Sequence, residues 1–359
     1  MPRVHNFSAG PAALPDEVLE IIRADLPDWN GTGMSVMEIS HRSKEFIAVA
    51  ERSEANLRQL LGISGDYSVL WIQGGATLQM AMAPLNLAGP DDIADYVVTG
   101  SWGKKAAQEA GRQCVVNVAA DSADQNYTYI PDESGWRHSD KASYLHITSN
   151  ETIGGVEFHF VPHAQVPIVA DMSSNILSRP IDVSDYGVIY AGAQKNIGPA
   201  GITLVIVRSD LLEPARANLP HLMMWKSYAE SESMTNTPPT FAWYVADLVF
   251  QHLLRIGGLD VMAEINERKA GKLYAAIDGS GFYSNPVRPD CRSWMNVPFV
   301  LADAALDGTF LSESAAAGLT NLKGHRSVGG MRASIYNAVP EASVDALISF
   351  MAEFERKYG

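Results

Sequence analysis

Short apolar runs rich in β-branched residues recur between Tyr67 and Val207. Runs such as Val188 to Tyr190 and Ile202 to Val207 are typical of buried strands, because these side chains fit a pleated surface that is covered on both sides. Stretches with helical spacing of apolar residues separate the runs. This alternation predicts an α/β fold in which helices cover both faces of a mostly parallel sheet.

Other segments extend this pattern on both sides of the predicted sheet. Helical spacing predicts a helix over residues 43–62 and another over residues 259–277, which could connect two domains. Residues 294–301 and 331–336 are expected to form strands. The last helix is expected to begin at Pro340, and its acidic residues come early and its basic residues late, as the helix dipole favours.

The change of pattern near residue 258 predicts two domains. A chain of 359 residues is long enough for a substantial core and for more than one domain. We expect an N-terminal arm over residues 1–15, a large α/β domain over residues 16–258 and a small α+β domain over residues 259–359.

Composition and charge narrow the classes of function. The formal net charge of −14 argues against nucleic acid or an anionic membrane surface as a partner. An anionic substrate must then be held by a few local arginines that work against the overall field. The N-terminus lacks an apolar secretory core, which favours a cytoplasmic location.

Signals for membrane, disulfide and metal sites are weak. The most apolar stretch, residues 241–256, carries charged side chains and predicts a helix of a soluble domain rather than a membrane span. Cys114 and Cys291 form neither a disulfide framework nor a zinc pattern. His159 and His163 have a spacing that suits a metal on a helix, but a proline lies between them, and we expect no metal.

Lys195 is the first candidate for catalysis. It lies among small residues, between strand-like runs that end at Tyr190 and begin at Ile202. An ammonium group there is costly unless it is paired, solvated or covalently used, and a lysine that links to a carbonyl cofactor meets the last condition. The alternative is a loop lysine whose amine reaches water.

Asp171 closes the apolar run Val166 to Ala170, at the carboxyl end of a predicted strand, where open α/β sheets place ligand groups. Pyridoxal phosphate needs a carboxylate against its pyridine nitrogen, so that the protonated ring can accept electrons. The chain between Asp171 and Lys195 has room for one crossover, which would place the two groups on neighbouring strands. A turn former or a helix N-cap is the alternative for this aspartate.

Gly74 and Gly75 lie between a predicted strand and a helix pattern that becomes clear at Leu78. The free N–H groups of a helix N-terminus suit a phosphate dianion, and Thr77 adds a hydroxyl group. The spacing matches neither a dinucleotide fingerprint nor a Walker motif. Trp102 follows another strand in a loop between glycines, where its indole could lie flat against a planar heterocycle or simply plug the core.

Candidate anion-binding residues occur at both ends of the chain. They are the pairs His41-Arg42 and His325-Arg326, together with Arg332. Arginine can form two parallel hydrogen bonds with a carboxylate or a phosphate. A solvated surface charge is the alternative for any one of them, although two His-Arg pairs beside glycine-rich turns are harder to dismiss.

These motifs coincide with those of a known family. Over almost its whole length the chain resembles the phosphoserine aminotransferases, which are class V, fold-type I pyridoxal phosphate enzymes. The most specific stretches are VMEISHR at 36–42, YAGAQKNIGPAG at 190–201 and NTPPT at 236–240. The resemblance implies a large domain with a mostly parallel, seven-stranded type of sheet, a smaller C-terminal domain, and a homodimer whose active sites are shared across the interface.

The resemblance also implies roles for individual residues. Lys195 would carry the covalent link to pyridoxal phosphate, Asp171 would hold the pyridinium, and Trp102 would stack on the ring. The other cofactor contacts would be Ala76 and Thr77 at the phosphate, Thr152 and Gln194 near the ring hydroxyl, and Asn236 and Thr237 from the second subunit. The substrate contacts would be Arg332 at the α-carboxylate, and His41 and Arg42, with His325 and Arg326 lent by the partner, at the distal carboxylate or phosphate.

The implied reaction moves an amino group from L-glutamate to 3-phosphohydroxypyruvate and yields 2-oxoglutarate and O-phospho-L-serine, a step of serine biosynthesis. A second implied activity forms 4-phosphohydroxy-L-threonine from 3-hydroxy-2-oxo-4-phosphooxybutanoate, on the route to pyridoxine. At Thr77 some family members carry an arginine, so the distal anion here would depend on the remaining arginine and histidine groups.

Three other functions stay open at this point. One is another class V aminotransferase, of the alanine–glyoxylate or serine–glyoxylate type, which has no need of paired His-Arg groups. A cysteine desulfurase would need a mobile nucleophilic cysteine, and nothing around Cys114 or Cys291 suggests one. A catalytically silent binding module would have no reason to combine Lys195, Asp171 and Trp102.

Overall fold

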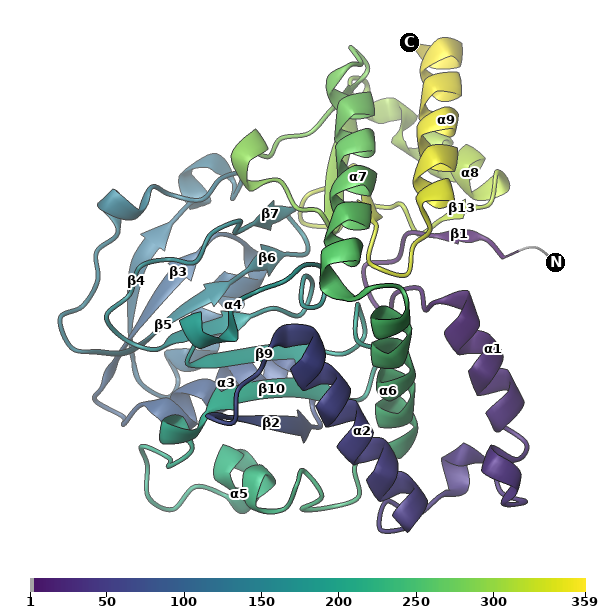
Figure 1. Ribbon diagram of the computed structural model, residues 1–359. Coiled ribbons are helices and arrows are strands. Elements are labelled where there is room, and N and C mark those ends of the chain that lie inside the picture. Colours follow the sequence, from purple (N-terminus) through teal and green to yellow (C-terminus); the bar gives the residue numbers. More distant parts are fainter. Residues whose placement is uncertain (1–2) are drawn as a thin grey trace.

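A central sheet organises the computed structural model, which describes residues 3–359 (Figure 1). Within those residues the sheet has seven strands, and only β10 runs antiparallel to its neighbours. The α/β fold with a mostly parallel sheet is therefore confirmed. In spatial order the strands are β2 (Tyr67–Ile72), β10 (Thr203–Arg208), β9 (Val188–Gly192), β8 (Ile168–Asp171), β5 (Ala142–Thr148), β3 (Ile93–Val98) and β4 (Val115–Asp121).

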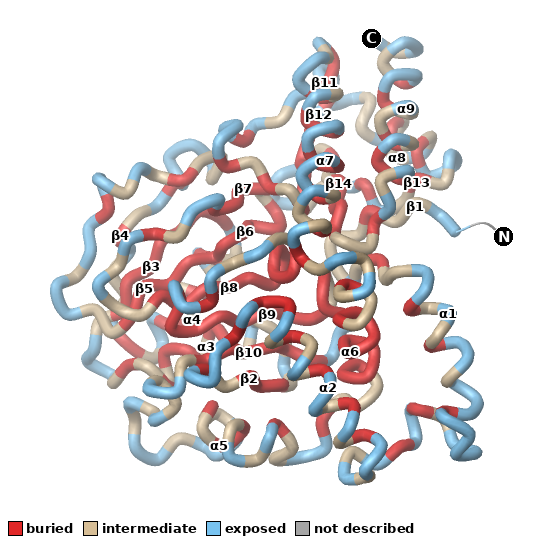
Figure 2. Tube along the Cα trace, in the orientation of Figure 1, coloured by how far each residue is buried: buried red, intermediate tan, exposed pale blue. Residues whose placement is uncertain are grey.

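Helices cover both faces of this sheet because successive side chains of a buried strand point to opposite sides. On β2, for example, Trp71 packs toward Trp243 and Phe250, whereas Leu70 and Ile72 belong to the core on the other face. Figure 2 shows the inner strands as a buried layer, whereas the edge strand β4 is mostly exposed or half-buried. The covering helices are α2 (Lys44–Leu61) and α6 (Thr240–Arg255) on one face, and α3 (Gly75–Leu87), α4 (Ser101–Ala110) and α5 (Trp225–Glu230) on the other.

The sequence pattern overstated the helical content of the middle of the chain. No α-helix lies between β4 and β9, where residues 122–187 contain, besides strands β5 and β8, only short 3₁₀ turns, extended loops and a two-stranded hairpin. Pro131, Gly135, Pro162 and Pro167 interrupt helical hydrogen bonding there. The chain therefore crosses from β5 to β8 and from β8 to β9 without an α-helix.

The C-terminal part of the chain forms a second core. A small antiparallel sheet of β11 (Tyr283–Ser284), β12 (Asn296–Leu301) and β14 (Met331–Ser334) packs with helices. These helices are α7 (Gly258–Asp278), α8 (Asp307–Ala316) and α9 (Glu341–Tyr358), drawn in green to yellow in Figure 1. The helices predicted over 259–277 and from Pro340 onward are thus present.

The N-terminal segment joins this second core rather than the large sheet. Strand β1 (His5–Asn6) pairs in parallel with β13 (Leu319–Thr320), and Phe7 is fully buried in the second core. Helix α1 (Asp16–Asp25) then packs against α6. We propose that the two cores mark the domains expected from the sequence, a large one over 16–258 and a small one over 259–359. Of the arm expected over 1–15, the described residues 3–15 would be bound to the small domain, and residues 1 and 2 lie outside the described part.

Neither a membrane span nor a metal cluster is present in the described part of the chain. None of its helices is long and apolar enough to cross a bilayer. Residues 3–359 also contain no group of three or more acidic, histidine or cysteine side chains arranged to hold a metal ion.

Candidate active site

A cavity of about 330 Å³ opens where the parallel strands end. Strands β5, β8 and β9 end in its wall, and α3 and α4 begin there. This carboxyl-end edge is the usual place for ligands in open α/β sheets. The predicted site residues that line it are Ala76, Thr77, Trp102, Thr152, Asp171, Gln194, Lys195, His325 and Arg332.

Lys195 follows the end of β9 and projects into this cavity. Its Nζ donates a hydrogen bond to Thr152 Oγ1 at 2.6 Å. Burial lowers the pKa of Lys195 to about 8; the charge of Asp171 raises it, and that of Arg332 lowers it further. An amine with a pKa this close to neutrality has a substantial unprotonated fraction, which is the nucleophilic form.

Asp171 ends β8, and its neighbour across the parallel pair is Tyr190 on β9. The prediction that Asp171 and Lys195 come from adjacent strands is therefore confirmed. The side chain is 5% exposed, and its Oδ1 accepts the Ser173 N–H at 2.9 Å. Burial raises the pKa of Asp171, whereas the Ser173 hydrogen bonds and the Lys195 charge lower it. A cation held against this carboxyl group would favour its charged form.

The phosphate-binding candidate lies at the beginning of α3. The helix begins at Gly75, one turn before the pattern suggested, so Ala76 and Thr77 are in its first turn. Gly74 and Gly75 adopt φ values of +96° and +69°, which side chains other than glycine rarely tolerate. The first turn carries no acidic residue and no side-chain cap. Its N–H groups therefore suit a phosphate.

Trp102 differs in local structure from the prediction. It was expected in a loop, but it lies in the first turn of α4. Its indole lines the cavity, and the Lys105 ammonium lies 5.4 Å from the ring centroid. The buried indole nitrogen has no hydrogen-bond partner within residues 3–359.

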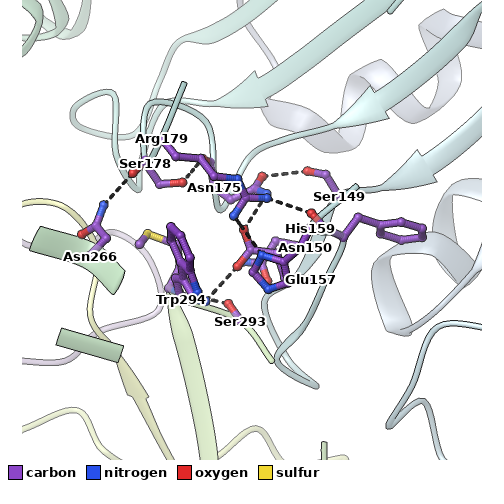
Figure 3. A network of polar contacts seen from close by, with 12 residues as sticks. Ser149, Asn150, Glu157, His159, Asn175, Ser178, Arg179, Asn266, Ser293 and Trp294 are labelled. Carbon is purple, nitrogen blue, oxygen red and sulfur yellow. Dashed lines mark hydrogen bonds and ion pairs between the residues drawn. The ribbon is translucent and has the colours of Figure 1, made fainter. Parts of the chain in front are cut away.

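A polar network behind the cavity fixes the loop that follows Asp171 (Figure 3). The fully buried Glu157 accepts hydrogen bonds from Asn175 at 3.1 Å, from Arg179 at 2.6 Å and from the Trp294 N–H at 2.8 Å. Ser149, directly after β5, links the same loop to that strand, because its hydroxyl lies 2.9 Å from the Asp171 carbonyl and 2.7 Å from Asn175 Oδ1 and shares its one proton between these two acceptors. The network joins the loop to the hairpin of β6 (Asn150–Glu151) and β7 (Val156–Glu157), and to the second core.

The other predicted site residues lie outside the cavity of their own chain. Asn236 and Thr237, which were expected to act from a second subunit, do not line it. His41 and Arg42 do not line it either. Arg326 is outside as well. His325 was expected from the partner, but it lines the cavity of its own chain, in a loop whose ends are joined by the hydrogen bond from the Arg332 N–H to the Leu322 carbonyl at 2.7 Å.

Several lining residues were missed by the sequence reasoning. Asn150 precedes the predicted Thr152, and Ser173 and Ser174 follow the predicted Asp171. Thr148 ends β5, and its buried hydroxyl has no partner within residues 3–359. Their position directly after an apolar, strand-like run is a signal that the sequence contains. The prediction used this signal for the charged residues Asp171 and Lys195 but not for the uncharged polar ones.

The cavity therefore combines a lysine amine, a buried carboxylate, a helix N-terminus, an indole face and an arginine. This donor set fits pyridoxal phosphate, whose aldehyde, pyridine nitrogen, phosphate and flat ring need partners of these kinds. The sequence profile of the aminotransferase class-V family matches residues 4–347. A protein of Hahella chejuensis named phosphoserine aminotransferase is 58% identical over 353 residues, which are 98% of each chain.

The chain belongs to the class-V aminotransferases, within the phosphoserine aminotransferase family.

Solved structures agree with this assignment. A phosphoserine aminotransferase from Bacillus circulans subsp. alkalophilus is 48% identical, with a TM-score of 0.96 over 99% of each chain. A structure described as PLP-bound phosphoserine aminotransferase from Trichomonas vaginalis is 40% identical, with a TM-score of 0.93 over 98% of this chain and 100% of that one. The fold-type I architecture is thereby confirmed, and the cofactor of this family member is pyridoxal phosphate.

Proposed function

We propose that this protein transfers the amino group of L-glutamate to 3-phosphohydroxypyruvate and releases O-phospho-L-serine and 2-oxoglutarate. One observation carries the proposal: Lys195, Asp171 and Arg332 meet in one cavity at the carboxyl ends of adjacent strands. The names of the full-length relatives point to the same substrate. A second activity on 3-hydroxy-2-oxo-4-phosphooxybutanoate, on the route to pyridoxine, remains an expectation.

Each side chain of this cavity would have a separate role in the transamination. Bound pyridoxal phosphate supplies an electron sink for negative charge at the substrate Cα. Lys195 Nζ would hold the cofactor in the resting enzyme and, once displaced by the donor, would take the proton from Cα. Asp171 would keep the pyridine nitrogen protonated, and Thr152 would orient the Lys195 amine. Arg332 would orient the substrate through its α-carboxylate.

The remaining cofactor contacts would come from the backbone of α3 at Ala76 and Thr77, from the Trp102 ring and from Gln194. We propose a homodimer in which Asn236 and Thr237 of one subunit reach the cofactor phosphate of the other. Two observations bear on this placement: Gln73 Nε2 donates to the Thr237 carbonyl at 2.9 Å within one chain, and neither Asn236 nor Thr237 lines the cavity of that chain, which leaves both residues for the cavity of a partner.

The distal anion would be held by His325 of the same chain and by His41, Arg42 and Arg326. None of the last three lines the cavity in one chain, which favours a site completed by a partner subunit. Thr77 adds no charge to the distal site. A cytoplasmic location, as the sequence predicts, fits a metabolic enzyme of this kind.

Two half-reactions test the proposed function. The purified protein with bound cofactor is mixed with L-glutamate, and 2-oxoglutarate is measured in a single turnover. Addition of 3-phosphohydroxypyruvate should then yield O-phospho-L-serine, whereas glyoxylate should be a poor acceptor. Faster turnover of glyoxylate would replace the proposal with an alanine–glyoxylate or serine–glyoxylate aminotransferase. Failure of both half-reactions would favour the catalytically silent module.

A further inference from the structure

Glu151 is a buried carboxylate that the proposed mechanism does not use. It lies on β6, between Asn150 and Thr152, and has 0% exposure. Its two oxygens accept backbone N–H groups from Trp102 at 3.0 Å and from Gly103 at 2.7 Å. A carboxylate that is buried without hydrogen-bond partners is strongly unfavourable. These two N–H groups therefore have to replace the water that the Glu151 carboxylate loses on burial.

These two N–H groups belong to the first turn of α4. The N-cap residue Gly100 has no side chain to cap the helix, so Glu151 caps it from 49 residues further along the chain. A carboxylate at this position also interacts favourably with the helix dipole. Burial raises the pKa of Glu151 to about 7, although both hydrogen bonds lower it.

The first turn of α4 leaves space for this carboxylate. A Cβ atom on Gly100 would overlap the carboxyl group of Glu151. The φ of Gly100 is 174°, which any residue can adopt, so close approach rather than backbone conformation requires glycine here. A Cβ on Gly103 would lie 3.3 Å from Glu151 Oε1, a tight contact that a small shift could relieve.

Glu151 connects two walls of the cavity. On one side it holds the turn that carries Trp102, whose indole lines the cavity. On the other side Thr152, the next residue, accepts the hydrogen bond of Lys195 Nζ, and its carbonyl accepts one from Arg332 at 3.1 Å. Displacement of Glu151 would therefore move the indole relative to the lysine that carries the cofactor.

We propose that Glu151 is a positioning residue for the cofactor, which sets the Trp102 ring against the cavity by capping α4 from the strand that leads into Thr152. This inference rests on the proposed function, in which Trp102 stacks on the cofactor ring. Glu151 itself does not line the cavity. Its effect passes through Trp102.

Glu151→Gln keeps the size of the side chain but places an amide N–H group against one of the two backbone donors. Because one charge-assisted hydrogen bond to the turn that carries Trp102 is lost, we expect cofactor affinity to fall about 10- to 100-fold. The affinity is measured by titrating the cofactor-free protein with pyridoxal phosphate. The visible circular dichroism of the bound cofactor should change as well, because it reports the surroundings of the ring.

A double-mutant cycle with Trp102→Phe tests whether Glu151 acts through the indole. If it does, the affinity loss of the double variant is smaller than the product of the two single losses. Multiplicative losses, or a Glu151→Gln protein with the affinity and circular dichroism of the wild type, would overturn the inference. Should Glu151→Gln fail to fold, Gly100→Ala keeps the carboxylate but forces it to move, because the added Cβ would overlap it, and should change the circular dichroism in the same direction; an unchanged spectrum would count against the inference.

Asp247→Asn is the matched control. Asp247 is also a fully buried carboxylate, but it is bound by Arg52 at 2.6 Å and lies on α6, away from the cavity. This variant should lose thermal stability and keep the cofactor spectrum. The proposed function is tested separately, and it fails if the wild-type protein holds no cofactor at Lys195. If the wild type does hold the cofactor there, but the Glu151 variants bind it with the same affinity and circular dichroism, the inference alone fails.

Discussion

Removal of the Arg332 guanidinium should weaken every amino-acid substrate to a similar extent. Arg332 lies on β14 and lines the cavity, and its Nη1 donates to the Thr152 carbonyl at 3.1 Å. The remaining N–H groups are available for a carboxylate. Two charge-assisted hydrogen bonds of about 1.5–3 kcal/mol each would be lost in Arg332→Ala.

This loss corresponds to about 3–6 kcal/mol of transition-state stabilisation, and therefore to a decrease of about 10²- to 10⁴-fold in kcat/KM. Arg332→Lys should recover part of it, because the positive charge remains but the planar fork does not. The charge of Arg332 also lowers the pKa of Lys195. The alanine variant should accordingly show a raised pKa for the Lys195 amine in the cofactor-free protein.

The assay is the single-turnover rate with L-glutamate, O-phospho-L-serine and L-alanine as donors. All three carry an α-carboxylate, so the fold-decrease should be the same for each. Arg356→Ala, an exposed arginine on the last helix, serves as the control and should match the wild type. A decrease below tenfold at Arg332, or one confined to donors with a distal anion, would refute this role.

Two further predictions concern charges elsewhere. Arg42→Ala should reduce kcat/KM for O-phospho-L-serine and L-glutamate but leave L-alanine unchanged; equal losses for all donors would contradict a distal role. Lys269 is fully buried, donates to three backbone carbonyls, and has its pKa lowered to about 7 by burial. Between about pH 7 and pH 10.5 the Lys269 amine is protonated in the unfolded chain but largely neutral in the folded protein. The free energy of unfolding therefore rises with pH across this window, by about a few kcal/mol. Lys269→Met should remove that rise in urea-unfolding curves recorded across the window, and parallel curves for the two proteins would show that the pKa of Lys269 is not lowered.

The sequence pattern was sufficient for the elements that carry the chemistry. Asp171 and Lys195 follow apolar runs that had to be buried strands, and the ends of parallel strands meet at one edge of the sheet. The helix-poor segment 122–187 was harder, because proline and glycine exclude helices but do not specify which turns replace them. Trp102 was assigned to a loop because glycines flank it, although the helix already begins at Ser101.

The buried charges could not be identified without the fold. Glu151 stands between Asn150 and Thr152 in what looks like a polar turn, and only its contact with α4 explains why it is buried. For Lys269 the sequence does contain a weak indication of burial, namely its position in the apolar pattern of the helix. It lies in register with Met262 and Leu273 on the buried face of α7, but the apolar pattern alone does not say which carbonyls would receive its ammonium group.

The identity of the lysine that binds the cofactor is the most direct test of the whole account. The purified protein, saturated with pyridoxal phosphate, is reduced with borohydride and digested, and the peptides are weighed. A pyridoxyl group on the peptide that contains Lys195, and its absence from a Lys195→Ala protein that still folds, is the expected result. The same group on another lysine, or on none, would contradict the central claim.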